Sequence, residues 1–354
     1  MTRDIGIDLG TTNVLFHLKG RGIILNEPAL IAVDQTSQNV IAVGRDAYDM
    51  RGRTPESVEI IQPLKGGVVS DYDLTETLLL YFCRRTHIRR GIRRANVLIS
   101  TPTNVSEIER LSLYEAVQKV TSGRVKIEME PMVAAVGSGL DILSAKGCMV
   151  VDIGGGTTDI AIISSAEILF AESLKLAGDD FDEAIIQYVR DHYQLLIGIR
   201  SAEVIKKELA CALPVSEKEV RSAELKGRDL VSGLPKAINL DSNDLYRALK
   251  APLDQIIRAI QRVLEQAPPE IIADIHDQGI ILTGGGAMIQ DLGLLISEQV
   301  KVTAVASDHP MDAVALGTGT MLDWIASGKL TRRQAVNKNK KTNFFVRLWR
   351  KIWN

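Results

Sequence analysis

The sequence of 354 residues has few of the side chains that build disulfide frameworks or zinc sites. It contains three cysteines, Cys83, Cys148 and Cys211, and each lies in an apolar segment. This usage is typical of buried thiols in a reducing compartment. The five histidines are scattered and do not show the spacing of zinc ligands. We therefore expect neither a disulfide-stabilised fold nor a zinc centre.

The sequence also lacks a long apolar run. No stretch reaches the about 20 apolar residues of a transmembrane helix, and residues 1–10 lack the basic and apolar regions of a signal peptide. Both absences predict a protein that is made and kept in the cytoplasm. Aromatic residues make up only 5%, but 45% of the residues are hydrophobic, which is enough for the core of a large α/β protein. The length suggests two domains.

The small net charge of −2 conceals an uneven distribution. Residues 329–354 contain nine Lys and Arg and no Asp or Glu, so the rest of the chain has 33 basic and 44 acidic groups, a formal charge of −11. The tail is therefore a separate electrostatic unit.

Two similar stretches dominate the remaining sequence, DLGTTN at 8–13 and DIGGGTTD at 152–159. Each lies between two apolar runs, which predicts a strand, a tight turn and a second strand. Backbone N–H groups in a glycine turn can surround phosphate oxygens, and Thr hydroxyls add donors. The leading carboxylates, Asp8 and Asp152, would repel a phosphate unless Mg²⁺ lies between them. Taken singly, either Asp could equally be a carboxylate that caps its own turn.

The repeat extends beyond these hairpins. A third glycine run at 282–287 follows an apolar strand at 279–282 and precedes a helix expected from Ile289, and EPMVAAVGSG at 130–139 resembles HPMDAVALGTG at 309–319. Proline suits the first turn of a helix, and Ala and Gly faces allow two helices to pack closely. The internal repeat predicts two related halves that face one cleft, with a pair of helices as a hinge beneath it.

The rest of the chain alternates between strand and helix patterns. After the second hairpin we expect a helix from Gly178, a second helix that begins at Ser201 as N-cap, a strand-rich insertion at 213–243 and a long helix at 242–265. Pro268 and Pro269 are expected to break the chain before the third glycine strand.

These five segments, in this order, resemble the nucleotide-binding signature of the actin, heat-shock chaperone and sugar kinase superfamily. Over residues 4–327 the amino-acid sequence is most similar to the MreB/Mbl family of bacterial actin homologues. The resemblance implies an α/β, actin-like ATPase fold with two ribonuclease-H-like domains, each with a subdomain, around a nucleotide cleft. It divides the chain into domain I (1–138 and 310–328, small subdomain 34–66), domain II (139–309, small subdomain 179–243), a basic linker (329–343) and an amphipathic helix (344–354).

The same resemblance assigns the site residues. Asp8 and Asp152 would hold Mg²⁺ through water, and Glu130 would orient or activate the water that attacks ATP. The phosphates would lie between two loops, Gly10, Thr11, Thr12 and Asn13 on one side and Gly154, Gly155, Gly156, Thr157 and Thr158 on the other. The ribose and adenine would contact Gly178, Asp179, Glu203, Lys206, Lys207, Gly284, Gly285, Gly286 and Ala287. From the residues alone, Glu130 could instead simply stabilise a helix N-terminus, and Glu203 and Lys206 could form a solvated ion pair.

The sequence departs from the family pattern at four places. The family usually has two adjacent acidic residues before the proline, whereas this chain has Met129 beside Glu130. It usually has an apolar residue where this chain has Lys207, and Ala where this chain has Thr12. Some members carry a membrane-inserting apolar pair where residues 89–94 are basic (RRGIRR).

The C-terminal segment has the pattern of an interfacial membrane helix. At about 100° per residue its apolar side chains fall on one arc and its basic side chains on the remainder. The arc includes Phe344, Phe345, Leu348, Trp349, Ile352 and Trp353. Anionic lipid would add attraction for the basic groups. Alternatives are a helix that docks on the protein itself or a basic arm for nucleic acid, although no nucleic acid partner is expected.

The resemblance implies an ATP-hydrolysing cytoskeletal protein that forms filaments on the inner face of the plasma membrane and guides cell-wall synthesis. Head-to-tail contacts can generate open filaments, but they leave no readable motif. Alternatives are a chaperone-type ATPase, for which only about 25 residues remain after the ATPase core, and a small-molecule kinase, for which no catalytic base beside an acceptor pocket can be assigned.

Overall fold

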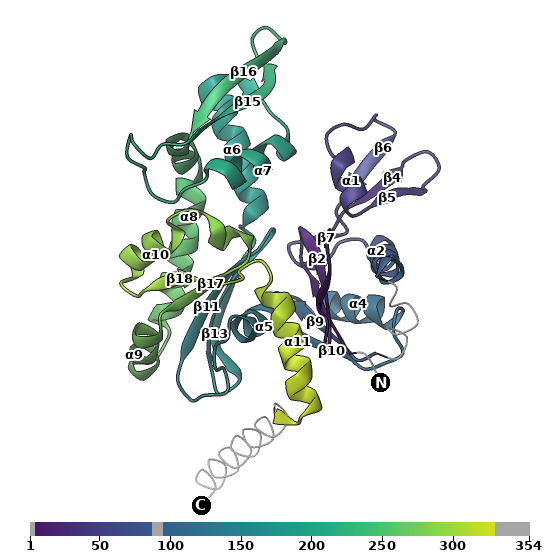
Figure 1. Ribbon diagram of the computed structural model, residues 1–354, viewed down its shortest axis with the longest axis vertical. Coiled ribbons are helices and arrows are strands. Elements are labelled where there is room, and N and C mark those ends of the chain that lie inside the picture. Colours follow the sequence, from purple (N-terminus) through teal and green to yellow (C-terminus); the bar gives the residue numbers. More distant parts are fainter. Residues whose placement is uncertain (1–3, 87–94, 330–354) are drawn as a thin grey trace, which may run out of the picture.

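The computed structural model describes residues 4–86 and 95–329 (Figure 1). Its framework is two five-stranded mixed sheets. The first contains, from edge to edge, β3 (Gly22–Pro28), β2 (Asn13–Leu18), β1 (Ile5–Leu9), β9 (Val97–Thr101) and β10 (Val125–Met129). The second contains β13 (Glu167–Leu174), β12 (Thr158–Ser164), β11 (Cys148–Ile153), β17 (Ile280–Thr283) and β18 (Ala304–Ala306).

The two sheets have the same connectivity. In each, the first three strands form an antiparallel meander, and the fourth and fifth add in parallel beside the first. The predicted hairpins are confirmed, because β1 pairs with β2 and β11 with β12 around the two glycine turns. The internal repeat in the sequence is therefore a repeat of topology.

Helices cover both faces of both sheets. Against the outer face of the first sheet pack α2 (Tyr72–Arg85) and α4 (Glu107–Gln118), with Leu78 and Phe82 fully buried. Against the outer face of the second pack α6 (Gly178–Tyr193), α8 (Ser242–Glu265), α9 (Pro269–Gln278) and α10 (Leu292–Val300). The short β7 (Leu64–Lys65) and β8 (Val68–Val69) form a separate hairpin. Cys83, Cys148 and Cys211 are buried and free, as expected.

The space between the sheets is filled by two small-faced helices, α5 (Glu130–Gly137) and α11 (Ala313–Ala326) (Figure 1). A Cβ added at Gly137 would lie 1.8 Å from the Ala313 carbonyl oxygen, and one at Gly317 would lie 1.9 Å from that of Val133. The backbones therefore touch where glycine permits it, which confirms the close packing predicted for this pair.

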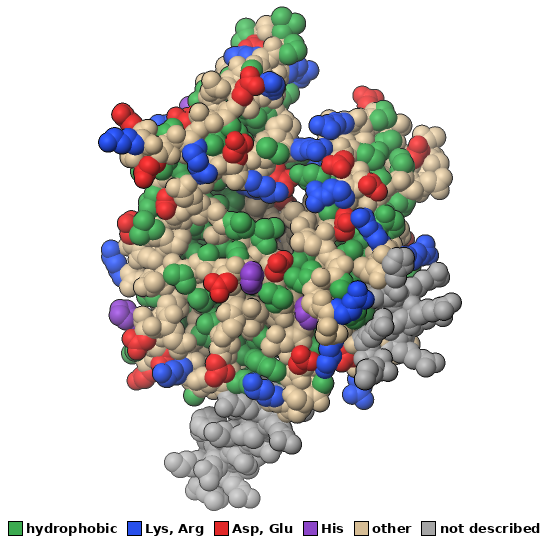
Figure 2. Space-filling view, viewed as in Figure 1, with side chains coloured by type: hydrophobic (Ala, Val, Ile, Leu, Met, Phe, Trp, Pro, Cys, Tyr) green, Lys and Arg blue, Asp and Glu red, His purple; other side chains and the backbone are tan. Residues whose placement is uncertain are grey.

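Two smaller units extend from the sheets (Figure 1). The first consists of the sheet β5 (Val40–Val43), β4 (Ile31–Asp34) and β6 (Val58–Ile61) with the helix α1 (Arg45–Met50). The second consists of β14 (Leu195–Leu196), β15 (Ser222–Asp229), β16 (Pro235–Asp241) and the helix α7 (Ile199–Leu209), packed on α6 and α8. The space-filling view shows a notch between the two units, with Lys and Arg side chains on both sides (Figure 2).

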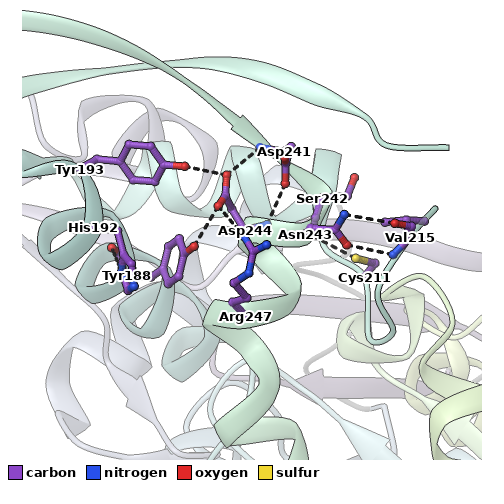
Figure 3. A network of polar contacts seen from close by, with 10 residues as sticks. All are labelled: Tyr188, His192, Tyr193, Cys211, Val215, Asp241, Ser242, Asn243, Asp244 and Arg247. Atoms are coloured by element: carbon purple, nitrogen blue, oxygen red, sulfur yellow. Dashed lines mark hydrogen bonds and ion pairs between the residues drawn. The ribbon is translucent and has the colours of Figure 1, made fainter. Parts of the chain in front are cut away.

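A buried polar network fixes the start of α8 in the second unit (Figure 3). Asp244 accepts hydrogen bonds from the Tyr188 hydroxyl at 2.9 Å and the Tyr193 hydroxyl at 2.8 Å. Asp241 and Asp244 also form a reciprocal capping box, at 2.9 and 3.1 Å. The network joins α6 to α8 and holds the base of the β15–β16 hairpin in place.

Two predicted helix starts are wrong, and one predicted feature is incomplete. Ser201 is not an N-cap: α7 begins at Ile199, because the amides of Ser201 and Ala202 already donate to the Gly198 carbonyl. The predicted break at Pro268 and Pro269 is confirmed, because α8 ends at Glu265, but an unpredicted helix follows at once: Pro269 is the first residue of α9, where its missing N–H costs no helical bond. The helix expected from Ile289 is α10, which begins three residues later, at Leu292, because Ile289 is the extended residue that ends the 3₁₀ turn η1 (Gly285–Met288).

Within residues 4–86 and 95–329, no helix combines the length and the apolar character needed to cross a membrane. The basic segment 89–94 and the tail side chains predicted to contact lipid lie outside the described residues.

Candidate functional site

The tips of the two glycine hairpins touch each other. A Cβ added at Gly155 would lie 1.8 Å from the Thr12 hydroxyl oxygen, and one at Gly156 would lie 2.8 Å from that of Thr11. No larger residue fits at Gly155 without moving the opposite loop. The structure thus brings the two predicted phosphate loops together from opposite sheets.

Neighbouring segments hold these loops in shape. Thr11 accepts a hydrogen bond on its hydroxyl from the Gly67 amide at 2.8 Å and one on its carbonyl from Gln62 at 2.7 Å. In the second loop, the Gly178 amide donates to the Gly154 carbonyl at 3.1 Å, and the Asp179 amide donates to that of Gly155 at 2.8 Å. The N-terminus of α6 therefore lies directly against the second loop.

Two of the predicted phosphate ligands have structural partners instead. The Asn13 side-chain amide donates to Asn26 of the neighbouring strand at 3.0 Å, and the Thr158 hydroxyl donates to the Leu176 carbonyl at 2.7 Å. Both residues also belong to paired strands, so they frame the loops more than they contribute to the glycine turns themselves.

Asp8 and Asp152 are buried on the central strands of the two sheets. Burial first, and then the nearby charge of Asp152, raise the pKa of Asp8 to about 7, against the effect of one hydrogen bond from Ser100. Burial also raises the pKa of Asp152 to about 6, although Thr283 donates to it at 2.6 Å. These donors come from the parallel neighbours β9 and β17, so the carboxylates are not simple caps of their own turns.

Two buried, mutually repelling carboxylates form a site that favours a cation. No group of three or more His, Cys, Asp or Glu side chains in the described part of the chain has the geometry to bind a metal ion directly. The donors present suit Mg²⁺, which keeps several waters and often takes one or two protein carboxylates.

Glu130 begins α5 and is only 7% exposed. Its pKa is raised well above the ordinary value by burial first, and then by the charges of Asp159, Asp8 and Asp152. A carboxylate retained only to stabilise a helix N-terminus would gain nothing from three acidic neighbours. This environment is instead typical of a group that exchanges protons during a reaction.

Asp159 is a site residue that the sequence reasoning missed. One carboxylate oxygen accepts from the Thr103 amide at 2.9 Å and the Thr103 hydroxyl at 2.7 Å, whereas the other oxygen is buried and has no hydrogen-bond partner. Asp159 lies opposite Asp152 in the β11–β12 pairing, where the first hairpin has Leu15 opposite Asp8. This charge in an otherwise apolar strand was the available signal.

The residues predicted for the nucleoside come together on α6 and α7. Lys206 forms an ion pair with Asp182 at 2.8 Å and donates to the Gly178 carbonyl at 2.6 Å. Glu203 accepts from the Tyr48 hydroxyl at 2.8 Å and pairs with Lys207. The alternative of a Glu203–Lys206 pair is therefore wrong, because each side chain has a different partner.

The third glycine run lies at the end of β17 beside Asp152. A Cβ at Gly284, where φ is +79°, would lie 2.2 Å from the Ile153 carbonyl oxygen, and one at Gly286 would lie 2.3 Å from the Ile153 side chain. These glycines are required by packing against β11. Only Gly285 has open space beside it, while Ala287 is buried.

Comparison with known proteins gives a consistent set of relatives. The family described as "MreB/Mbl protein" matches residues 2–329. The chain is 47% identical over 321 residues to cell shape-determining protein Mbl of Bacillus subtilis, covering 91% of this chain and 96% of that protein. It is 42% identical over 329 residues to cell shape-determining protein MreB of Escherichia coli K12, covering 92% and 94%.

Solved structures agree. MreB5 of Spiroplasma citri bound to AMPPNP superposes with a TM-score of 0.89 at 34% identity, covering 94% of this chain and 99% of that one. A MamK double helical filament superposes with a TM-score of 0.75 at 22% identity, covering 91% and 98%, a likeness of fold alone.

Proposed function

Because this chain belongs to the MreB/Mbl family of actin-like, cell shape-determining proteins, we propose that it is a cytoskeletal ATPase that forms filaments on a membrane. Its fold is the actin-like fold expected from the sequence. The observation that carries the proposal is the direct contact of two glycine loops beside a buried pair of carboxylates. The chaperone and small-molecule kinase alternatives are not favoured by this family assignment.

We assign domains I and II to the two sheets, each with its small subdomain. ATP is the proposed ligand of the cleft between these domains. The loops Gly10–Asn13 and Gly154–Thr158 would hold the phosphates from opposite sides through backbone amides, although the Gly154 amide itself donates to the Thr157 carbonyl at 2.9 Å. The nucleoside would lie against the start of α6 and the face of α7 that carries Glu203 and Lys206. The MreB5 neighbour bound to AMPPNP supports a nucleotide of this class.

Hydrolysis would be assisted by Glu130. In its ionised form its buried carboxylate would orient a water against the γ-phosphate and accept the proton, and the raised pKa makes the ionised form a stronger base. A Mg²⁺ ion held through water by Asp8 and Asp152 would neutralise phosphate charge. Asp159 lies on β12, next to the strand that carries Asp152. Its hydrogen bonds to Thr103 would hold its carboxylate in place near Glu130.

Self-assembly is supported by the filament neighbour and by one exposed surface. The turn that joins β15 to β16 presents Val231, which is 84% exposed, and Leu234, which is 64% exposed. Asp229 fixes this turn through its carboxylate, which accepts from the amides of Val231 and Ser232 at 2.9 and 2.8 Å. A rigid apolar tip that contributes nothing to the core is suited to contact with a second copy of the chain.

Membrane attachment would come from the tail. Residues 344–354 combine an apolar aromatic arc with basic side chains, and the basic linker 329–343 joins them to α11. Cell-wall synthesis enzymes are the proposed downstream partners, by family membership.

The test is ATP-dependent sedimentation together with phosphate release. We expect the protein to pellet with ATP and Mg²⁺ and to release phosphate without any acceptor molecule. Persistent monomers at high protein concentration, or phosphate transfer to an added sugar, would contradict the proposal.

A further inference from the structure

Two helices from opposite subdomains meet at the top of the notch. Tyr48 of α1 donates its hydroxyl to Glu203 of α7 at 2.8 Å, across 155 positions of sequence. One residue along, Arg200 donates to the Asp49 carbonyl at 3.1 Å and lies 3.4 Å from the Asp49 carboxylate. Figure 1 shows α1 and α7 facing each other above the strands that carry the glycine loops.

These contacts form one cluster. The guanidinium of Arg200 lies 5.2 Å from the centre of the Tyr48 ring, and that of Arg45 lies 5.4 Å from it. The ring is thus bracketed by two cations while its hydroxyl reaches a carboxylate. Cation–π contacts and a charge-assisted hydrogen bond together hold Tyr48 in one orientation.

Glu203 is the member that links this cluster to the site. Its side chain is 12% exposed, and its two oxygens accept from Tyr48 and Lys207 respectively. A carboxylate oxygen can accept two hydrogen bonds, so each retains room for a hydroxyl donor. Burial raises the pKa of Asp179 on α6, and the charges of Lys206 and of Arg51, which follows α1 on the other side of the notch, oppose this rise.

We propose that Tyr48 and Glu203, reinforced by Asp49 and Arg200, form a clasp across the mouth of the nucleotide cleft. The clasp holds the two subdomains together and must open for a nucleotide to enter or leave. Tyr48 is thereby a positioning residue, which sets the rate of nucleotide exchange through Glu203 without taking part in hydrolysis. This inference rests on the proposed function, because it takes the notch as the nucleotide entrance.

The first measurement does not involve nucleotide. Spin labels at Asp46→Cys and Glu208→Cys, both exposed positions, report the separation of α1 and α7, since the native cysteines are buried. We expect a narrow distance distribution in the otherwise unchanged protein and a broader, longer one when Tyr48→Phe is added. Identical distributions would overturn the clasp.

The second measurement is the release of a fluorescent ATP analogue after mixing with excess ATP. Tyr48→Phe removes only the hydroxyl and keeps the ring between its two cations, so we expect release to be about ten-fold faster. Single-turnover phosphate formation should stay within about two-fold, because Glu130 is untouched. In a double-mutant cycle, Tyr48→Phe should accelerate release much less in the Glu203→Gln background than in the unchanged protein, because its partner carboxylate is already lost.

Tyr188→Phe is the matched control. It also deletes a tyrosine hydroxyl bonded to a carboxylate, at 2.9 Å, but inside one subdomain (Figure 3). Equal acceleration by both variants, or unchanged release in Tyr48→Phe, would overturn the inference. If the labels separate as expected but the unchanged protein binds no nucleotide, the clasp stands as a contact and the proposed function fails.

Discussion

At the scale of single residues, the site depends on four buried carboxylates, Asp8, Asp152, Glu130 and Asp159. The sequence indicates the first two through the repeat, and the resemblance to the MreB/Mbl family indicates Glu130. It does not indicate Asp159, because the role of that side chain depends on Thr103, 56 positions away, and on the strand pairing that sets it opposite Asp152. Only the three-dimensional structure shows which carboxylate oxygens already have a hydrogen-bond partner.

Glu130→Gln tests the assigned chemistry. The amide keeps the size of the side chain but cannot take up a proton, so phosphate release should fall by about 100-fold, while ATP affinity changes by less than about three-fold. A titration with ATP measures the affinity, and a phosphate assay measures the rate of release. Hydrolysis at the unchanged rate would show that Glu130 only stabilises the start of α5.

At the scale of elements, strands and helices with clear periodicity are predictable. The hairpins, α6 and the long α8 all form where the pattern places them. The start of α7 and the helix α9 are not predicted. A Ser suited to capping lies inside α7, and the break at the two prolines is followed directly by α9, which Pro269 begins. The cap signal in α7 is overridden because packing favours a longer helix, whereas Pro269 follows the preference of proline for the first position of a helix.

Gly137→Ala tests the contact between α5 and α11. The added methyl would meet the Ala313 carbonyl oxygen at 1.8 Å, so the two helices must separate, and we expect a loss of about 1–3 kcal/mol in the free energy of unfolding. Chemical denaturation measures it. Gly198→Ala, where no atom lies within 4 Å of the new Cβ, is the control and should cost much less.

Val231→Asp tests the exposed turn between β15 and β16. A charge on this apolar tip should weaken association of copies and lower the amount of protein that pellets with ATP several-fold. Nucleotide affinity should not change, because the turn is remote from the glycine loops (Figure 1). Val231→Ile should pellet normally. Equal pelleting of the Asp variant would remove the turn from the proposed filament contact.

At the scale of the whole molecule, the sequence repeat predicts two halves and a shared cleft, and the two sheets of identical connectivity bear out the repeat. What the sequence does not predict is how the halves meet. The contact of Gly155 with Thr12 and the bond from Tyr48 to Glu203 each join residues more than 140 positions apart. No local pattern encodes such pairs.

Removal of residues 330–354 tests the tail as the membrane anchor. We expect the shortened protein to lose co-sedimentation with vesicles that contain anionic lipid and to keep ATP binding, since the site lies within residues 4–329. In the full chain, Trp349→Ser with Trp353→Ser should reproduce the loss, and binding to neutral vesicles should be weaker than to anionic ones. Undiminished vesicle binding by the shortened chain would assign attachment to another surface.

The most direct test of the central claim is calorimetric titration of ATP with and without Mg²⁺. We predict one site per chain, affinity at least about ten-fold higher with Mg²⁺, and loss of that difference in Asp8→Asn and Asp152→Asn. Absence of saturable binding, or the same magnesium dependence in both variants as in the unchanged protein, would contradict a nucleotide held between the two loops.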